Sequence, residues 1–145
     1  ACLMDFGLST VLGRLLDDSV NEDSKIQHGA IRWTAPELLT THNYPTDLKL
    51  TTKHNIYSFG CVMFHVLSLV IPWHDIDDYT IFQKILCGED ILHPETSDAT
   101  SNITDTCWDQ IEQCWLVDPS TRPSALMALD FIKSELEVLK QDVST

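Results

Sequence analysis

The sequence predicts a mainly α-helical domain. Apolar side chains recur at helical spacing in residues 77–88, 105–115 and 124–141, and residues 54–74 are apolar almost throughout. Apolar residues three or four positions apart line one face of a helix, which packs that face against the rest of the protein. With 145 residues and 43% hydrophobic content, the chain is long enough for one such domain, and it shows no internal repeat and no second domain.

The first predicted element is a loop. Residues 8–34 have no sustained period and are rich in Ser, Asp, Asn and Gly, and a loop of that length inside a compact domain is usually functional. Its acidic part, residues 17–23, lies among Ser and Thr hydroxyls and is a candidate for regulatory phosphorylation. A solvated loop is the simpler interpretation.

Residues 54–74 contain no Asp, Glu, Lys or Arg, so the segment is long enough to be tested as a membrane span. Small and polar residues interrupt it: Ser58, Gly60, His65, Ser68 and Pro72. This pattern favours the buried central helix of a globular domain over a membrane span. We expect Thr51 or Thr52 to cap its start and Pro72 to end it.

Two shorter helices follow. The first starts at Asp77 and ends at Gly88, because acidic residues suit a helix N-terminus and glycine suits its C-cap. A surface loop then runs to Ile103. The second begins near Asp105 and carries its apolar residues on one face: Trp108, Ile111 and Trp115.

The last predicted helix follows a turn at Asp118-Pro119 and is capped by Ser124. Its apolar stripe has steps of 3, 3, 4 and 3: Leu126, Leu129, Ile132, Leu136 and Leu139. We expect a surface helix that docks on the body by this stripe and frays after Gln141.

Charge and cysteine usage exclude several classes of function. Lys and Arg number 9 against 22 Asp and Glu, a net charge of -13, which disfavours nucleic acid and anionic membranes as partners. The five cysteines form no C-x-x-C pair and lie mostly in apolar stretches, as reduced cysteines do, which favours a cytoplasmic location. The six histidines never pair at i,i+3 or i,i+4, so no dedicated zinc site is predicted.

Five short motifs occur in a fixed order. Asp5-Phe6-Gly7 is followed 30 residues later by Ala35-Pro36-Glu37. Three more motifs follow: Tyr57-Ser58-Phe59-Gly60, Ile71-Pro72-Trp73, and the segment Cys114-Trp115-x-x-Asp118-Pro119-x-x-Arg122-Pro123. In order and spacing, this set resembles the C-terminal lobe of protein kinases over residues 1 to about 140. Arg32-Trp33 and the Cys-Trp pair look like the tyrosine-kinase-like or tyrosine-kinase branch.

The resemblance implies a partial protein kinase domain over residues 1–141 with a tail at 142–145. It places an activation segment at 5–37 and a helical lobe at 52–140, with the N-terminal lobe and the catalytic loop absent. No residue within the chain is then a catalytic base.

The resemblance also assigns roles to residues. Asp5 is the implied magnesium ligand, and with Phe6 and Gly7 it belongs to the ATP site. The implied substrate-peptide loop comprises Gly29, Ala30, Ile31, Arg32 and Trp33. Glu37 and Arg122 are implied to form a buried ion pair that clamps the activation segment onto the helical lobe, a structural role.

Several parts of a working kinase do not occur in these 145 residues: the glycine-rich loop, the lysine that reaches the α/β-phosphates, and H-R-D-x-x-x-x-N. The first residue is Ala, so we expect a piece of a longer protein, cut before D-F-G. Magnesium and ATP are cofactors of that parent, and neither is expected to bind tightly to the piece.

Three residues depart from the family pattern. Asn55 replaces the usual Asp whose carboxylate supports the catalytic loop, His65 stands where Glu is frequent, and Ala30 replaces a Thr of many serine/threonine kinases. The piece is also expected to expose an apolar patch along Ile56, Phe59, Met63 and Leu67 or nearby faces, and to aggregate or bind chaperones.

Three hypotheses follow. The parent transfers the γ-phosphoryl of ATP to Ser, Thr or Tyr of a protein; or it is a pseudokinase that docks protein partners through the helix near Tyr79 to Leu86; or the chain is a gene fragment without function of its own.

Overall fold

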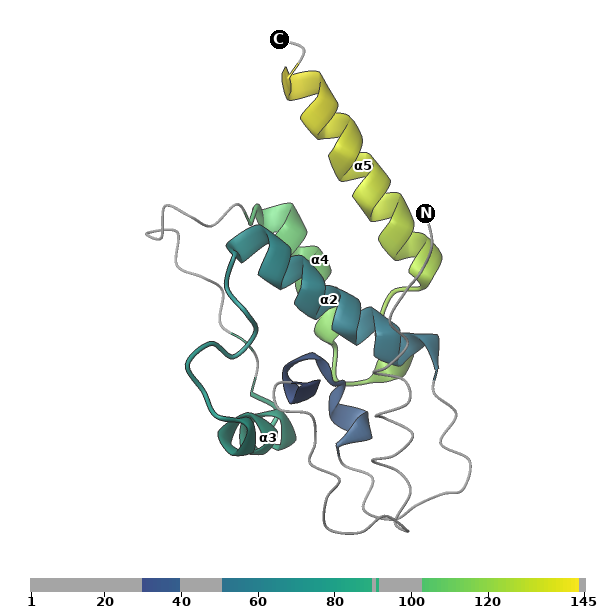
Figure 1. Ribbon diagram of the computed structural model, residues 1–145. Helices are drawn as coiled ribbons and strands as arrows, with labels where there is room; N and C mark the ends of the chain where they lie inside the picture. The colour runs from purple at the N-terminus through teal and green to yellow at the C-terminus, as the bar shows by residue number, and fades with distance from the viewer. Residues whose placement is uncertain (1–29, 40–50, 90, 92–102, 144–145) are drawn as a thin grey trace.

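The computed structural model describes residues 30–39, 51–89, 91 and 103–143, and in that part of the chain every regular element is a helix (Figure 1). The elements in order are η1 (Ala30–Trp33), η2 (Pro36–Leu38), α2 (Thr52–Ser68), α3 (Asp78–Leu86), α4 (Asp105–Trp115), η3 (Pro119–Thr121) and α5 (Ala125–Val143). The mainly α fold class is confirmed.

Helix α2 is the central element. It runs through the middle of the molecule with α4 alongside it (Figure 1). Thr51 is its N-cap, as predicted, but the helix ends at Ser68, and Leu69 takes a left-handed conformation with φ 61°. The predicted stop at Pro72 was therefore too late, because the chain had already turned. Within the described residues, no helix combines the length and hydropathy needed to cross a membrane.

Close packing of α2 on α4 forms the main core. Its buried side chains come from the A-P-E segment, α2 and α4: Ala35, Tyr57, Cys61, Met63, Phe64, Ile111 and Trp115. Gly60 allows this approach, since a Cβ there would lie 2.7 Å from Cys114 Cβ and 2.9 Å from Trp115 Nε1. Any larger residue would push the two helices apart.

Helix α3 lies apart from this pair and packs against η1 (Figure 1). Asp77 caps it by accepting hydrogen bonds from the backbone N–H groups of Tyr79 and Thr80, and hydrogen bonding by Thr80 lowers the pKa of Asp77. At its other end Gly88 has φ 73°, a conformation that suits glycine. The predicted start is confirmed, whereas the helix ends at Leu86 with Cys87 as its C-cap, just before the predicted end at Gly88.

Helix α5 begins where predicted, with Ser124 Oγ accepting from Met127 N at 3.2 Å. It touches the body by Ala128 and Phe131 and then extends away from it (Figure 1). The expectation that the leucine stripe would dock on the body was wrong: Leu126, Leu129, Ile132, Leu136 and Leu139 are all exposed. A smaller face of the helix makes the contact instead.

The apolar patch expected on α2 lies on a nearby face and does not include all the residues named for it. Ile56 and Met63 are buried, because α2 turns them toward α4 and α5. The exposed apolar residues of this helix lie on a neighbouring face, at Val62, Val66 and the C-cap Leu69.

Candidate functional site

The predicted site residues fall into two groups. Asp5, Phe6, Gly7 and Gly29 lie outside the described residues. Ala30 to Trp33 form η1, and Glu37 lies in η2. The structure therefore shows how residues 30–38 are held against the helices, and this segment is the candidate site.

Arg32 ties η1 to the loop between α2 and α3. Its Nη1 donates to the carbonyl oxygens of Pro72 (3.1 Å) and Trp73 (2.5 Å), and its Nη2 donates to Ile76 O (2.6 Å). The same Nη2 lies 3.9 Å from Asp78 Oδ1, at the start of α3. One guanidinium thus organises a turn that contains the positive φ angles of Trp73 and Asp75.

Trp33 fixes the other side of η1 on α2. Its carbonyl oxygen accepts a hydrogen bond from Ser58 Oγ at 2.7 Å, and its ring meets that of His65 edge to face at 5.9 Å. Ile31 of η1 is buried in a small core with Trp73 and with Ile81 and Ile85 of α3. The segment is therefore anchored to both α2 and α3.

Glu37 and Arg122 meet although 85 residues separate them. Arg122 Nη1 donates to Glu37 Oε1 at 2.7 Å and Nη2 donates to Oε2 at 2.8 Å, a bidentate pair. The side chain of Arg122 is fully buried, while that of Glu37 is 22% exposed. The pair joins the end of the candidate segment to the turn before α5.

Backbone carbonyls satisfy the rest of the guanidinium. Arg122 Nε donates to Leu116 O at 2.8 Å, Nη1 donates to Lys53 O at 3.1 Å, and the ring of Tyr57 lies 5.2 Å from the guanidinium carbon. Lys53 Nζ in turn donates to the carbonyl oxygen of Arg122. Burial of a charge without such partners would cost several kcal/mol, so this network explains how Arg122 is tolerated in the core.

His54 extends the network to the start of α2. Its Nδ1 accepts from Thr51 N at 3.2 Å, so in the neutral ring the proton is on Nε2, which lies 3.3 Å from Glu37 Oε1. Burial lowers the pKa of His54, with the Glu37 carboxylate opposing and Arg122 adding to that shift. The Glu37 carboxylate therefore lies close to the protonated nitrogen of a neutral imidazole.

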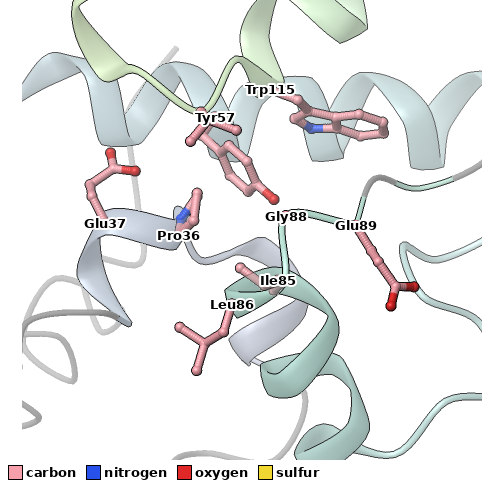
Figure 2. Close-up of a pocket in the computed structure, with 9 residues that line it drawn as sticks. Pro36, Glu37, Tyr57, Ile85, Leu86, Gly88, Glu89 and Trp115 are labelled. Atoms are coloured by element: carbon pink, nitrogen blue, oxygen red, sulfur yellow. The ribbon is translucent and has the colours of Figure 1, made fainter.

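A hollow of about 230 Å³ opens beside this network. Figure 2 shows Tyr57 and Trp115 on one side of it, Pro36 and Glu37 on another, and Ile85 and Leu86 of α3 opposite. Glu89 and Val117 complete its rim. The lining is mainly apolar with carboxylates at the edge, which suits a protein side chain better than a phosphate.

The described residues do not gather His, Cys, Asp and Glu side chains in one place. Among them, no group of three or more His, Cys, Asp or Glu is placed to hold a metal ion. Burial raises the pKa of the Cys61 thiol to about 12, so it is no nucleophile. Asn55 is exposed, and His65 Nδ1 is buried without a hydrogen-bond partner in this part of the chain. The arrangement holds residues 30–38 in place against the helices.

Sequence reasoning did not identify two of the anchoring residues. Arg32 was assigned to a substrate loop, and its bonds to three carbonyls depend on a turn with two positive φ angles that no glycine marks. His54 was treated as one of six scattered histidines. Its place three residues after a Thr N-cap was the available signal, because an N3 side chain can reach back to the N-cap N–H.

The comparisons with known proteins find protein kinases. The model of the protein kinase domain family matches residues 2–131. The tyrosine-protein kinase transforming protein RYK of Avian retrovirus RPL30 is 25% identical over 124 residues, which are 85% of this chain and 25% of that protein. The dual specificity protein kinase shkD of Dictyostelium discoideum is 28% identical over 120 residues, 83% of this chain and 14% of that protein.

A third relative belongs to another specificity class. The serine/threonine-protein kinase chk-2 of Caenorhabditis elegans is 30% identical over an alignment of 145 residues that covers 97% of this chain and 27% of that protein. The chain thus spans roughly a quarter or less of the length of the relatives it matches.

Proposed function

The chain belongs to the protein kinase domain family, and from that premise we propose that it forms the helical lobe of a kinase whose full-length form transfers the γ-phosphoryl of ATP to Ser, Thr or Tyr of proteins. The isolated chain, in this proposal, does not catalyse that transfer. Its 145 residues contain neither the phosphate-binding lysine nor the H-R-D-x-x-x-x-N loop that positions the base and the second metal ion.

The observation that supports this function best is the double anchoring of residues 30–38. Arg32 holds the segment to the loop before α3, and Glu37 holds it to Arg122 before α5. Kinase catalysis is mostly positioning of two substrates, so a rigidly held segment next to the chemistry is what the reaction needs. We propose that Gly29 to Trp33 shape the site of the substrate peptide.

The nucleotide end of the site is proposed from the sequence. Asp5 would hold the magnesium ion that bridges the ATP phosphates, Phe6 would set the orientation of Asp5, and Gly7 would allow the backbone change. Residues 5–37 then act as activation segment and 52–140 as helical lobe. Magnesium and ATP would bind the full-length protein and not this part of it alone.

The test uses the full-length protein that contains this chain. We expect magnesium-dependent transfer of labelled phosphate from ATP to a general protein substrate, and loss of that transfer in Asp5→Ala. Glu137→Gln, an exposed change on α5, is the matched control and should retain activity. A full-length protein that neither turns over nor binds Mg-ATP would refute the catalytic proposal and leave the docking function described next.

The second candidate function is a pseudokinase that docks protein partners through α3. Tyr79 on this helix is 73% exposed, and Ile85 and Leu86 line the hollow of Figure 2. Asn55, His65 and Ala30 are the departures that favour it. Asn55→Asp in the full-length protein distinguishes the two functions. A weak kinase should gain activity when Asp, the usual residue of the family, is introduced, and a docking module should not.

The third hypothesis is a gene fragment without function. Sequencing the transcript upstream of the Ala1 codon tests it.

We also propose an intracellular location, supported by the free thiols of Cys61, Cys87, Cys107 and Cys114.

A further inference from the structure

Helix α3 is attached to the rest of the molecule mainly through η1. Among the described elements, its main contact is with η1, and the two share the small core that contains Ile31 and Ile81. At the end of α3, Leu86 lies on one side of the hollow of about 230 Å³, and Tyr57 and Trp115 lie on the other (Figure 2). The position of α3 is therefore tied more closely to η1 than to the α2–α4 pair.

The loop between α2 and α3 needs support from outside itself. Trp73 and Asp75 have φ angles of 57° and 62°, a conformation that is unfavourable for residues with a side chain and persists only where the surroundings hold it. Arg32 supplies this support. Its guanidinium donates to the carbonyl oxygens of Pro72, Trp73 and Ile76. The conformation of the loop thus depends on a residue of η1.

The dependence is mutual. The side chain of Arg32 is only 16% exposed, so its guanidinium needs these acceptors in place of the water it has lost. Ile76, which accepts from Nη2, directly precedes Asp77, the N-cap of α3. If the start of α3 moves, the planar guanidinium loses the geometry of its hydrogen bonds, because it cannot follow three carbonyls independently.

The other end of residues 30–38 is held without α3. Glu37 binds Arg122 through two hydrogen bonds of 2.7 and 2.8 Å. Neither residue belongs to α3 or to the loop before it. A change in α3 should therefore reach η1 and leave η2 in place.

We propose that Arg32 is a positioning residue that makes η1 depend on the state of α3. An intact α3 presents the three carbonyl oxygens, and Arg32 then holds η1 in the arrangement that binds the substrate peptide. Loosening of α3 removes these acceptors and loosens η1, so both elements share one equilibrium. The consequence for the peptide rests on the proposed function, whereas the coupling itself is a property of the fold that is measured without activity.

Amide hydrogen exchange in the full-length protein measures the coupling. Asp77→Ala removes the exposed N-cap of α3, and loss of a cap should make the helix open about fivefold more often. The amides of Thr34 and Leu38 report on η1 and η2, since each donates a backbone hydrogen bond within its turn. We expect Thr34 to exchange at least about threefold faster in Asp77→Ala and Leu38 to be unchanged.

Two variants serve as matched controls. Asp77→Asn keeps a side-chain oxygen at the cap and should behave as the parent does. Thr104→Ala removes the corresponding cap of α4, where Thr104 Oγ1 accepts from Cys107 N at 3.2 Å. The main contacts of η1 are with α2 and α3, so this variant should loosen the start of α4 and leave Thr34 unchanged.

A second disruption acts away from the loop, because Asp77 adjoins Ile76. Gln83 is exposed in the middle of α3, where proline removes a backbone donor and breaks the helix. Gln83→Pro should therefore raise the exchange of Thr34 even if loss of the cap alone leaves α3 intact. Gln83→Ala at the same site should not.

A double-mutant cycle tests the role of Arg32. In Arg32→Ala the link is already broken, so Thr34 should exchange faster from the outset. Adding Asp77→Ala should then have no further effect on Thr34. The amide of Ile81, which donates to Asp77 O at 3.0 Å, should still exchange faster, because α3 itself is loosened.

Steady-state kinetics of the full-length protein test the consequence for the substrate. Asp77→Ala should raise KM for a peptide substrate severalfold and leave KM for ATP unchanged, while Thr104→Ala changes neither. If the full-length protein transfers no phosphate, the proposed function fails and the exchange measurement still decides the coupling.

Three results would overturn the coupling. They are a Thr34 amide that is unaffected although Ile81 exchanges faster, an equal effect of Thr104→Ala on Thr34, and additive effects of Arg32→Ala and Asp77→Ala. The last result would show that the shared apolar core links α3 to η1 without Arg32.

Discussion

The ion-pair junction around Arg122 buries a charged side chain, whereas the second half of α5, from Ile132 onward, exposes apolar ones. Arg122 carries a full charge and is completely buried, while Leu136 and Leu139 carry none and are half exposed or more. The two regions lie in one continuous stretch of chain, since the Arg122 junction directly precedes α5.

The difference shows that burial here depends on available partners. Arg122 is surrounded by a carboxylate, two backbone carbonyls and an aromatic ring, which together replace the water it loses. Within the described residues α5 meets the body through Ala128, Phe131 and Glu135, and its leucines lie outside this contact face. Hydropathy predicts which side chains would be stabilised by burial. Whether they are buried depends on the surfaces that the fold places beside them.

The largest effect should come from breaking the junction. Arg122→Ala leaves Glu37 without its bidentate partner and removes the contacts to Leu116 and Lys53, so we expect the free energy of unfolding to fall by about 3 to 5 kcal/mol. Urea denaturation followed by tryptophan fluorescence measures it. Lys133→Ala, an exposed cation on α5, serves as control. A loss below about 1 kcal/mol would mean that the junction contributes little to stability.

The next largest effect tests the packed half of the molecule. Gly60→Ala places a methyl group 2.7 Å from Cys114 Cβ, and the stiff α2–α4 contact can relieve it only by moving, so we expect a loss of about 1 to 3 kcal/mol. Ser134→Ala on exposed α5 adds no contact and should stay within about 0.5 kcal/mol. If Gly60→Ala raised the melting temperature, the α2–α4 contact would be looser than described.

Local patterns predicted the helices well. Ser124 caps a helix as predicted, Thr51 is one of the two predicted caps, and Asp77 caps the helix that its acidic start predicted, because capping depends on a few neighbouring residues. The end of α2 was predicted too late, since a left-handed Leu69 carries no sequence signal comparable to glycine. Local chemistry thus fixed the starts of helices better than their ends.

Contacts between distant segments could be predicted only in part. The meeting of Glu37 with Arg122 came from family resemblance, because nothing local links residues 85 positions apart. The anchoring by Arg32 was missed, since it requires three carbonyls brought together by a turn. The leucine stripe of α5 was recognised as apolar, but periodicity cannot say which surface it meets.

A smaller effect is expected at the second half of α5. In dilute protein Leu136→Ala should change the free energy of unfolding by no more than about 0.5 kcal/mol, because an exposed leucine loses little when it is shortened. Ile111→Ala, at a fully buried site in α4, should cost about 2 to 5 kcal/mol under the same conditions. A large loss at Leu136 in the monomer would show that the stripe does pack on the body.

The smallest expected effect concerns His54 and the dependence of the free energy of unfolding on pH. Burial holds the pKa of His54 below 6.5, so the unfolded chain binds more protons than the folded one as the pH falls below that value. The contribution of His54 to stability is therefore present above pH 6.5 and is lost on acidification toward its lowered pKa. His54→Gln keeps an amide near Glu37 but cannot titrate, so its stability should fall less steeply between about pH 6.5 and 5 than that of the parent chain. Urea unfolding at several pH values measures both slopes, with Asn55→Gln as a non-titrating control on the same turn. Equal slopes for His54→Gln and the parent would mean that protonated His54 gains from Glu37 as much as it loses by burial beside Arg122.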